Sequence, residues 1–197
     1  MTTMGAALTP AARLGVVAAA LVASSTALAA VQEELLAKPY AVHARADEPL
    51  LQAINAATPI TVNGQRFHGY TRWNVRWTFR WWRETSGRCT ITAVTTRLHV
   101  ELQLPELQRA TPSQQAEFDR YLPALKQHEQ GHVKFGRDAA RAVDEGIAQL
   151  PAETECATLE RRANALGQRI VQDHVEREKR YDLDTSHGAT QGAKLKR

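Results

Sequence analysis

Residues 111–150 read TPSQQAEFDRYLPALKQHEQGHVKFGRDAARAVDEGIAQL and predict a long amphipathic helix. Thr111, Pro112 and Gln114 form the capping pattern of a helix start, with proline at the first helical position. Pro123 predicts a kink or a break before residue 128. Apolar residues recur at near-helical spacing along the whole segment, namely Phe118, Leu122, Leu125, Val133, Ala140, Val143 and Ile147.

The helix contains the motif H-E-Q-G-H at residues 128–132. Because side chains four residues apart share a helix face, His128 and His132 can ligate one metal ion. Glu129 would lie beside that ion, where a carboxylate can take a proton from an attacking water and pass it to a departing amine. Imidazole ligands suit zinc, which needs no redox partner. The motif therefore predicts a zinc hydrolase.

A catalytic zinc site normally has three protein ligands and one open position, so a third ligand is required. His187 is the favoured candidate, because it stands beside a glycine in a polar segment that can fold back over the helices. Asp138 is a further candidate, at the ligand position of the peptidase pattern H-E-x-x-H-x-x-G-x-x-H/D. That pattern needs a glycine at position 135 to turn the chain, and this chain has Phe135 there, so the helix should carry Asp138 away from the metal. The remaining candidates lie in the next predicted helix: His174, Glu155, Glu160 and Glu176.

A second helix is predicted over 153–180, antiparallel to the first, and the polar segment 181–188 is predicted as a loop. A calcium site through Asp182, Asp184 and Ser186 does not fit the EF-hand pattern, which requires glycine and glutamate at its sixth and twelfth positions. Residues 193–197 are predicted as a flexible end.

Residues 39–104 are rich in strand and turn signals. Strands are predicted at 40–44, 59–62 and 65–69, a short helix at 50–57, and two longer strands from residue 69 and over 89–104, joined by a turn at Gly87. The fold class is therefore α+β: a small antiparallel sheet packed on two long antiparallel helices, with a zincin-like motif helix. The first long strand alternates Trp73, Val75, Trp77, Phe79 and Trp81 on one face with Arg72, Asn74, Arg76, Thr78 and Arg80 on the other.

The alternation argues against nucleic-acid binding, because it sends the rings and the arginines to opposite faces. The arginine stripe of Arg72, Arg76 and Arg80 is interpreted as a solvated face, with partner contact as the alternative. Removing residues 1–29 takes away one arginine from a formal charge of +4, which leaves about +3. This mild charge is compatible with loose attraction to anionic envelope polymers.

Residues 1–29 are predicted to be a secretory signal peptide, because an apolar run over 14–28 ends in the cleavage pattern Ala27-Leu28-Ala29. An uncleaved anchor is the alternative. Residues 30–192 would then form a single exported domain, periplasmic or secreted, with no membrane span. In such a compartment Cys89 and Cys156 predict one disulfide, and a thiolate zinc site lacks the usual C-x-x-C spacing.

Residues 39–192 resemble a family of bacterial proteins described as predicted secreted zinc-dependent proteases, domain of unknown function 922 (DUF922). The matching pieces are GQRFHGYTRWNVRW at 64–77, the two cysteines, Leu104-Pro105, HEQGH, and YDLDTSHGATQG at 181–192. The resemblance implies that His128 and His132 bind a metal, that Glu129 is the base, and that His187 is the third ligand.

The predicted function is an exported zinc metallopeptidase that hydrolyses peptide bonds with a water activated by zinc and Glu129. Its substrates would be peptides or proteins, cell-envelope peptides among them, and Tyr181 is a candidate donor to the developing oxyanion. The alternative is a non-catalytic exported module that binds metal, or associates with the envelope, through the same histidines. The substitution Glu129→Gln would separate the two, since only a hydrolase would lose its function.

Overall fold

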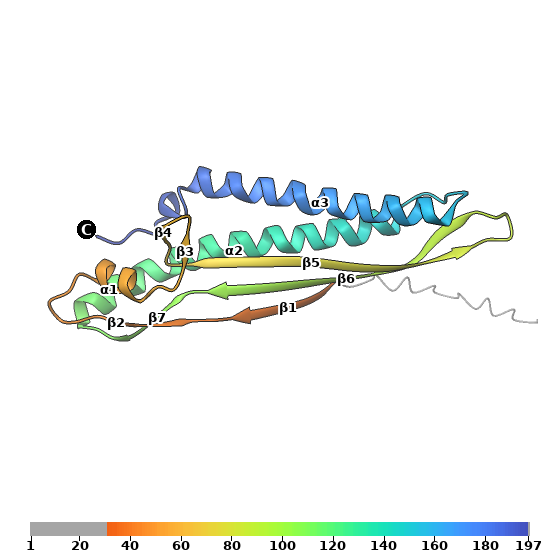
Figure 1. Ribbon diagram of the computed structural model, residues 1–197. Coiled ribbons are helices and arrows are strands. Elements are labelled where there is room, and N and C mark those ends of the chain that lie inside the picture. The colour runs from red at the N-terminus through yellow and green to blue at the C-terminus, as the bar shows by residue number, and fades with distance from the viewer. Residues whose placement is uncertain (1–30, 197) are drawn as a thin grey trace, which may run out of the picture.

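The computed structural model describes residues 31–196, so the predicted signal peptide at residues 1–29 lies outside the described residues. The fold is α+β as predicted, with the strands in the N-terminal half and two long helices in the C-terminal half (Figure 1). Among the described residues, no helix combines the length and apolarity needed to cross a membrane. The elements in chain order are β1 (Gln32–Ala37), β2 (Tyr40–His43), α1 (Leu50–Ala57), β3 (Thr61–Val62), β4 (Gln65–Arg66), β5 (Tyr70–Arg83), β6 (Cys89–Gln103), β7 (Pro105–Arg109), α2 (Pro112–Ala148), α3 (Cys156–Thr185) and the short 3-10 helix η1 (Ala189–Gln191).

The main sheet has the strand order β1-β6-β5. Strands β5 and β6 form the predicted antiparallel hairpin, with Gly87 in its turn at a φ of 86° that glycine adopts without strain. Strand β1 pairs with β6 in parallel, and β2 pairs with β7 in parallel. The prediction of a purely antiparallel sheet is therefore wrong at these pairs. The parallel pairs join segments that are far apart in the chain, 32–37 with β6 and 40–43 with β7, and no local pattern indicates the direction of such pairing.

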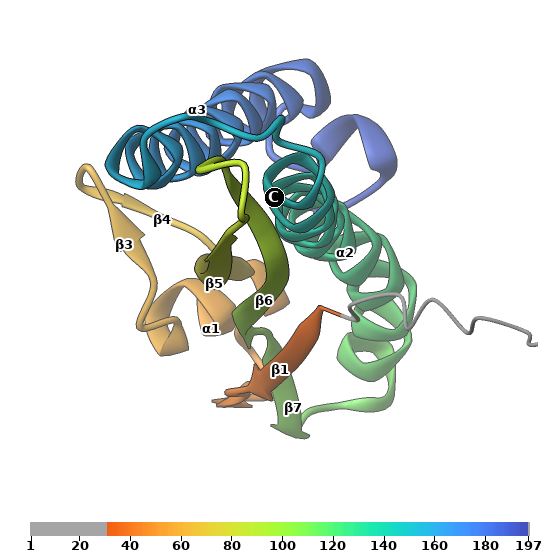
Figure 2. The ribbon, with the colours of Figure 1, turned by 90° about the vertical axis from the view of Figure 1, so that its right-hand side faces the viewer.

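Helices α2 and α3 lie together over one face of the sheet, and α3 returns along α2 (Figures 1 and 2). The apolar side chains of β5 face these helices as predicted: Val75 is buried, and Trp73, Trp77 and Phe79 pack against the same core. From α2 and β6 this core takes Val133, Ala139, Ala140, Val143, Ile147, Val94, Leu98 and Val100.

Helix α2 begins with the predicted capping box, in which Thr111 and Gln114 each bond the backbone of the other. Pro123 lies inside this helix, so of the predicted kink or break the break is absent, and the motif stands in the middle of one continuous element. Tertiary packing compensates for the backbone hydrogen bond that proline cannot donate, because Tyr121 and Leu125 on either side are buried in a second core cluster.

Two helical glycines allow tryptophans of β5 to approach the helices closely. A Cβ at Gly136 would lie 2.8 Å from Trp73, and one at Gly167 would lie 2.6 Å from Trp77. The indole N–H groups of Trp73 and Trp77 then donate to Glu178 and Asn164 of α3. These contacts hold α3 at a defined position beside β5.

Helix α3 continues beyond its predicted end at residue 180 and stops at Thr185, where Ser186 adopts the left-handed conformation typical of a helix C-cap. The segment predicted as a loop is therefore largely helical. The polar composition of this segment is typical of a loop, and the prediction rested on that composition alone. In the structure Thr185 accepts a hydrogen bond from the Gly188 N–H, and this contact closes the helix end. Asp182 consequently stands on a helix.

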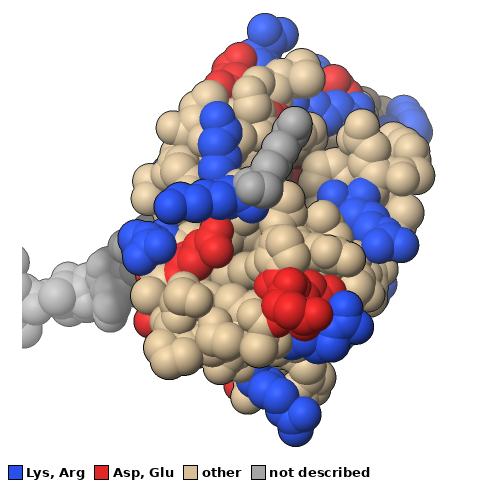
Figure 3. Space-filling model, turned by 90° about the vertical axis from the view of Figure 1, so that its left-hand side faces the viewer, with Lys and Arg blue, Asp and Glu red and all other residues tan. Residues whose placement is uncertain are grey.

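The predicted disulfide is confirmed: Cys89 and Cys156 join the start of β6 to the start of α3. At the other end of the molecule, Ala193 and Leu195 pack against the core cluster of α1 and the first turns of α2. This part of the predicted flexible end is therefore held in place. The end face formed by α1 and the C-terminal residues carries interspersed basic and acidic side chains (Figure 3).

Candidate metal centre

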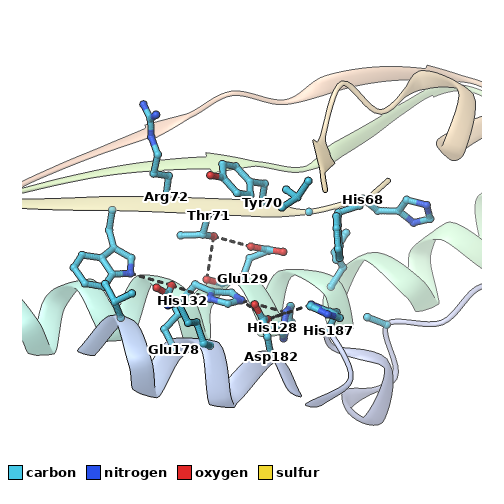
Figure 4. Close-up of a pocket in the computed structure, with 18 of the residues that line it drawn as sticks. His68, Tyr70, Thr71, Arg72, His128, Glu129, His132, Glu178, Asp182 and His187 are labelled. Atoms are coloured by element: carbon cyan, nitrogen blue, oxygen red, sulfur yellow. Dashed lines mark hydrogen bonds and ion pairs between the residues drawn. The ribbon is translucent and has the colours of Figure 1, made fainter. Parts of the chain in front are cut away.

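Two pairs of side chains face each other across the two long helices. His128 and His132 stand one turn apart on α2, and Glu178 and Asp182 stand one turn apart on α3 (Figure 4). In both pairs the spacing of four residues places the two side chains on one helix face. Because α3 is held against α2 and β5, the four groups meet inside the fold.

Three ligand-type atoms converge at the centre of this arrangement. Nε2 of His128 lies 3.2 Å from Nε2 of His132. Oδ1 of Asp182 lies 3.2 Å from the first of these nitrogens and 3.1 Å from the second. His128, His132 and Asp182 are also the group of side chains whose atoms lie close enough together to hold one metal ion.

The outer nitrogens of both imidazoles donate to acceptors that fix the ring orientation. Nδ1 of His128 donates to Oε1 of Gln191 at 3.0 Å, and Nδ1 of His132 donates to Oε1 of Glu178 at 2.9 Å. With the proton on Nδ1, a neutral imidazole presents a lone pair at Nε2. Such outer partners are the usual way in which proteins orient metal-binding histidines.

The three converging atoms fit a zinc ion by their chemistry and by their spacing. Oδ1 of Asp182 is buried, and its polar neighbours among the described residues are the ring nitrogens of His128, His132 and His187. Around a tetrahedral zinc with bonds of about 2.0–2.1 Å, neighbouring ligand atoms are separated by about 3.3–3.4 Å, close to the distances found here. Two imidazoles and one carboxylate are also a donor set that suits zinc.

Electrostatics at the centre favour a positive charge. Burial would lower the pKa of His132, but the carboxylates of Asp182 and Glu178 raise it to about 10. Burial would raise the pKa of Asp182, but the imidazoles of His128 and His132 hold that pKa well below its usual range. A proton on His132 and a metal ion would therefore compete for the same site between the carboxylates of Asp182 and Glu178.

Glu129 lies on the β5 side of the centre and is only 4 % exposed. Its Oε2 accepts a hydrogen bond from the Thr71 hydroxyl at 2.7 Å. A Cβ at Gly69 would lie 2.4 Å from its Oε1, so only glycine leaves room for this carboxylate. Burial raises the pKa of Glu129, and the Thr71 hydrogen bond and the two imidazoles offset this only in part.

Tyr181 does not occupy the position expected of an oxyanion donor. Its hydroxyl donates to the His128 carbonyl at 3.2 Å and exchanges hydrogen bonds with Gln191, and its ring stacks on His128. A Cβ at Gly131 would lie 2.3 Å from this hydroxyl, which explains the glycine inside the motif. Tyr181 is thus a packing partner of His128 and is absent from the residues that line the adjacent cavity.

His187 lies at the edge of the centre. Its Nδ1 is 3.6 Å from Oδ1 of Asp182, its ring meets Phe67 edge-on, and its side chain is half-exposed. The structure therefore groups Asp182, and not His187, with the two motif histidines. His187 follows the end of α3, with its backbone in the left-handed region, and among the described residues it contacts the centre only through Asp182 and Phe67.

The other candidate ligands lie elsewhere. His174 donates to the carbonyl of Ile170 on its own helix, and Asp138 pairs with Lys134 and Arg141 on the surface of α2. The glutamates also lie away from the centre: Glu155 is the residue before the first turn of α3, Glu160 accepts from Trp81, and Glu176 pairs with Lys179.

A cavity of about 800 Å³ opens beside the centre. His128, Glu129, His132 and Asp182 line it on one side. The β5 residues of its lining include Trp73 and Val75, and its α3 residues include Val171 and Val175, so an apolar shelf extends from the polar centre. The arrangement can hold a metal ion next to a space of substrate size.

Sequence reasoning missed Asp182, Glu178, Gln191 and Thr71. A signal for two of them was present, because Glu178 and Asp182 continue the four-residue spacing of His174 along α3. Thr71 and Gln191 are brought to the site only by the packing of β5 and the C-terminal segment, for which the sequence offered no local pattern.

Comparisons with known proteins identify a family. The model of the bacterial proteins of unknown function DUF922 matches residues 37–188, which is more than half of the chain of 197 residues. No curated protein and no solved structure matched the chain. The match begins at Ala37, the last residue of β1, includes β2 to β7 and helices α1, α2 and α3, and ends at Gly188. The chain therefore belongs to the DUF922 family of bacterial proteins.

Proposed function

We propose that the protein is an exported zinc-dependent peptidase whose metal is held by His128, His132 and Asp182. The observation that carries the proposal is the convergence of three ligand-type atoms at mutual distances of 3.1–3.2 Å, next to a buried glutamate and an open cavity. When bound, zinc would supply a Lewis acid that polarises the substrate carbonyl and an attacking water.

Glu129 is the proposed general base. It lines the cavity beside the histidines, and burial keeps its pKa above the usual range, closer to neutral pH. A carboxylate tuned in this direction accepts a proton from water and returns it to a leaving amine more readily than an ordinary surface glutamate. The Thr71 hydroxyl fixes its orientation.

The proposed oxyanion donor is His187, in place of Tyr181, which the sequence suggested. It lines the cavity, and its ring is anchored by Asp182 on one side and Phe67 on the other. A ring N–H directed into the cavity would donate to the oxygen of a substrate carbonyl as negative charge develops there.

The substrate is a peptide or protein chain, envelope peptides included. The apolar shelf of Trp73, Val171 and Val175 supports this, because it offers a surface for a side chain next to the scissile bond.

The test combines metal analysis with hydrolysis of quenched fluorescent peptides. The purified protein should contain close to one zinc per chain and cleave peptides. Glu129→Gln should keep the zinc and lose at least about 100-fold in turnover, as expected for a general base. His43→Ala, at an exposed position of β2, is the matched histidine control and should change neither.

A wild-type protein that binds zinc and cleaves no peptide would favour the non-catalytic metal-binding module. A wild-type protein that binds no zinc at neutral pH would contradict both hypotheses.

A further inference from the structure

Helices α2 and α3 leave the outer face of the sheet uncovered (Figure 2). The charge of this face changes along its length. Toward the start of β5 its charges are balanced, because Glu101 pairs with Arg72 and with Lys38. Farther along, Arg76 stands directly opposite Arg97 on β6, and Arg80 follows two positions beyond Thr78. Among the described residues no ion pair involves Arg76, Arg80 or Arg97.

The opposed pair Arg76 and Arg97 is unusual for a merely solvated surface. Like charges directly opposite each other destabilise a sheet, since their side chains are neighbours on the same face. Both side chains donate hydrogen bonds to neutral amides: Arg76 donates to Asn74, and Arg97 donates to Gln32. An anionic group between the two guanidinium groups would remove the repulsion and form charge-assisted hydrogen bonds with both.

A hollow of about 800 Å³ lies at this pair. Arg76, Arg97, Asn74 and Gln32 line it, and so do two carboxylates that have their own partners: Glu33 pairs with Arg137 of α2, and Glu34 pairs with His99. The surface is therefore recessed where the two arginines meet, which leaves room for a bulky acidic group.

Trp82 adds an aromatic surface to the same face. Because Trp81 donates its indole N–H to Glu160 on the helix side, the next residue points to the opposite, outer side of the strand. Trp82 is 67 % exposed, the largest exposure of any tryptophan among the described residues. With about 3.3 Å per strand residue, Arg76, Arg80 and Trp82 form a row about 20 Å long.

We propose that this row, Arg76, Arg80, Arg97 and Trp82, is a binding site for a linear anionic polysaccharide. Acidic groups of the polymer pair with the arginines, and a sugar ring stacks on Trp82. The site does not depend on the proposed peptidase activity, although its hollow shares Arg72, Trp73 and Asn74 with the candidate catalytic cavity and would hold a polymer close to it.

Other anionic partners fit less well. A bilayer docking flat on the sheet would cover Glu34 and Glu101 together with the arginines. A linear polymer that runs from Arg76 toward Trp82 leads away from both carboxylates, because they lie opposite His99 and Arg72 in the strand register. A bilayer meeting the hairpin turn would encounter Glu84. Single-stranded nucleic acid stacks successive bases on several rings, whereas Trp73, Trp77 and Trp81 all donate to α3 and are turned away from this face.

The experiment measures binding of dextran sulfate by titration calorimetry at low salt, with neutral dextran as the uncharged counterpart. Wild-type protein should bind dextran sulfate and not dextran, and rising salt should weaken the binding. The double variant Arg76→Ala/Arg97→Ala should bind about 10-fold or more weakly, from the loss of charge-assisted contacts. Trp82→Ala should also weaken binding, by several-fold.

Arg120→Ala, an exposed arginine on α2, is the matched control and should bind within about twofold of wild type, as expected for a charge outside the site. An equal loss in the control would show non-specific charge attraction and overturn the proposal. So would unchanged binding in the double variant with its circular dichroism spectrum intact, or tighter binding to poly(dT) or to anionic vesicles than to dextran sulfate.

Discussion

Oδ1 of Asp182 lies 3.1 Å from Nε2 of His132, although the two residues stand on different helices and far apart in the chain. The contact exists because α3 continues to Thr185 and carries Asp182 onto the same inward face as Glu178. A carboxylate, and not the expected third imidazole, therefore completes the candidate metal centre.

Zinc content should follow this geometry. Loss of a hydrogen-bond partner of a metal ligand typically weakens metal binding by roughly 10–100-fold. Asp182→Ala should weaken zinc binding by well over this amount, because it removes one of the three proposed ligand atoms. His187→Ala should retain zinc at wild-type affinity and lose turnover. Metal analysis after dialysis against a graded chelator separates the two variants. Zinc lost from His187→Ala and kept by Asp182→Ala would reverse the ligand assignment.

The partners of the outer imidazole nitrogens should matter for affinity as well. Glu178→Ala and Gln191→Ala should each weaken zinc binding by about 10–100-fold, since each removes the acceptor that orients one ring. Competition with a fluorescent zinc chelator measures the change. Gln172→Ala, whose amide contacts only the exposed Glu176, is the control on α3 and should leave affinity unchanged.

The metal-free protein should lose stability as the pH rises from neutral. Because the pKa of His132 is raised to about 10 in the folded state, its contribution is fully present below the unfolded value of about 6.5 and is lost as the pH passes through about 10. Urea unfolding in chelator at pH 6.5, 8 and 10 measures this. Asp182→Asn should flatten the decline, and an equally steep decline in that variant would contradict the assigned cause.

Asp182 acts in the opposite direction at low pH. Its folded pKa is depressed, so its contribution to stability is present above the unfolded value of about 3.9 and is lost as the pH falls below it. The metal-free wild type should therefore lose more stability between pH 5 and pH 3 than Asp182→Asn does. Identical acid profiles for the two proteins would show that the aspartate is not held by the imidazoles.

Gly131→Ala should destabilise the fold, although alanine normally favours a helix over glycine by about 1 kcal/mol. Its Cβ would overlap the Tyr181 hydroxyl, and such overpacking costs about 1–3 kcal/mol. Gly146→Ala is the control on the same helix, where the nearest side-chain atom would be 3.3 Å away at the flexible end of Ile170. Urea unfolding should show a loss for the first variant and none for the second.

Removing the disulfide should lower stability without disturbing the metal centre. The double variant Cys89→Ser/Cys156→Ser frees a loop with a sequence separation of 67 residues, and the expected loss is about 4 kcal/mol on the chain-entropy view. The free energy of unfolding in urea and the zinc content measured together provide the test. Loss of zinc from a variant that is still folded would show that the bridge also positions α3 at its far end.

The sequence by itself determined the elements whose signals are local. The capping box at Thr111 and the alternation from Trp73 to Phe79 are read from neighbouring residues, and both are present in the structure. The pair His128 and His132 is likewise fixed by helical spacing alone, since four residues return a side chain to the same face. The two cysteines indicated their bridge by their even number.

Only the tertiary structure decided what stands opposite that pair. The end of α3, the parallel entry of β1 and the continuity of α2 through Pro123 depend on packing and on hydrogen bonds between distant segments, which leave no periodic trace in the chain. Asp182, Glu178, Gln191 and Thr71 reach the site because β5, α3 and the C-terminal turn are held against α2. A metal centre needs atoms within a few ångströms of one point, and only folding in three dimensions brings such distant atoms together.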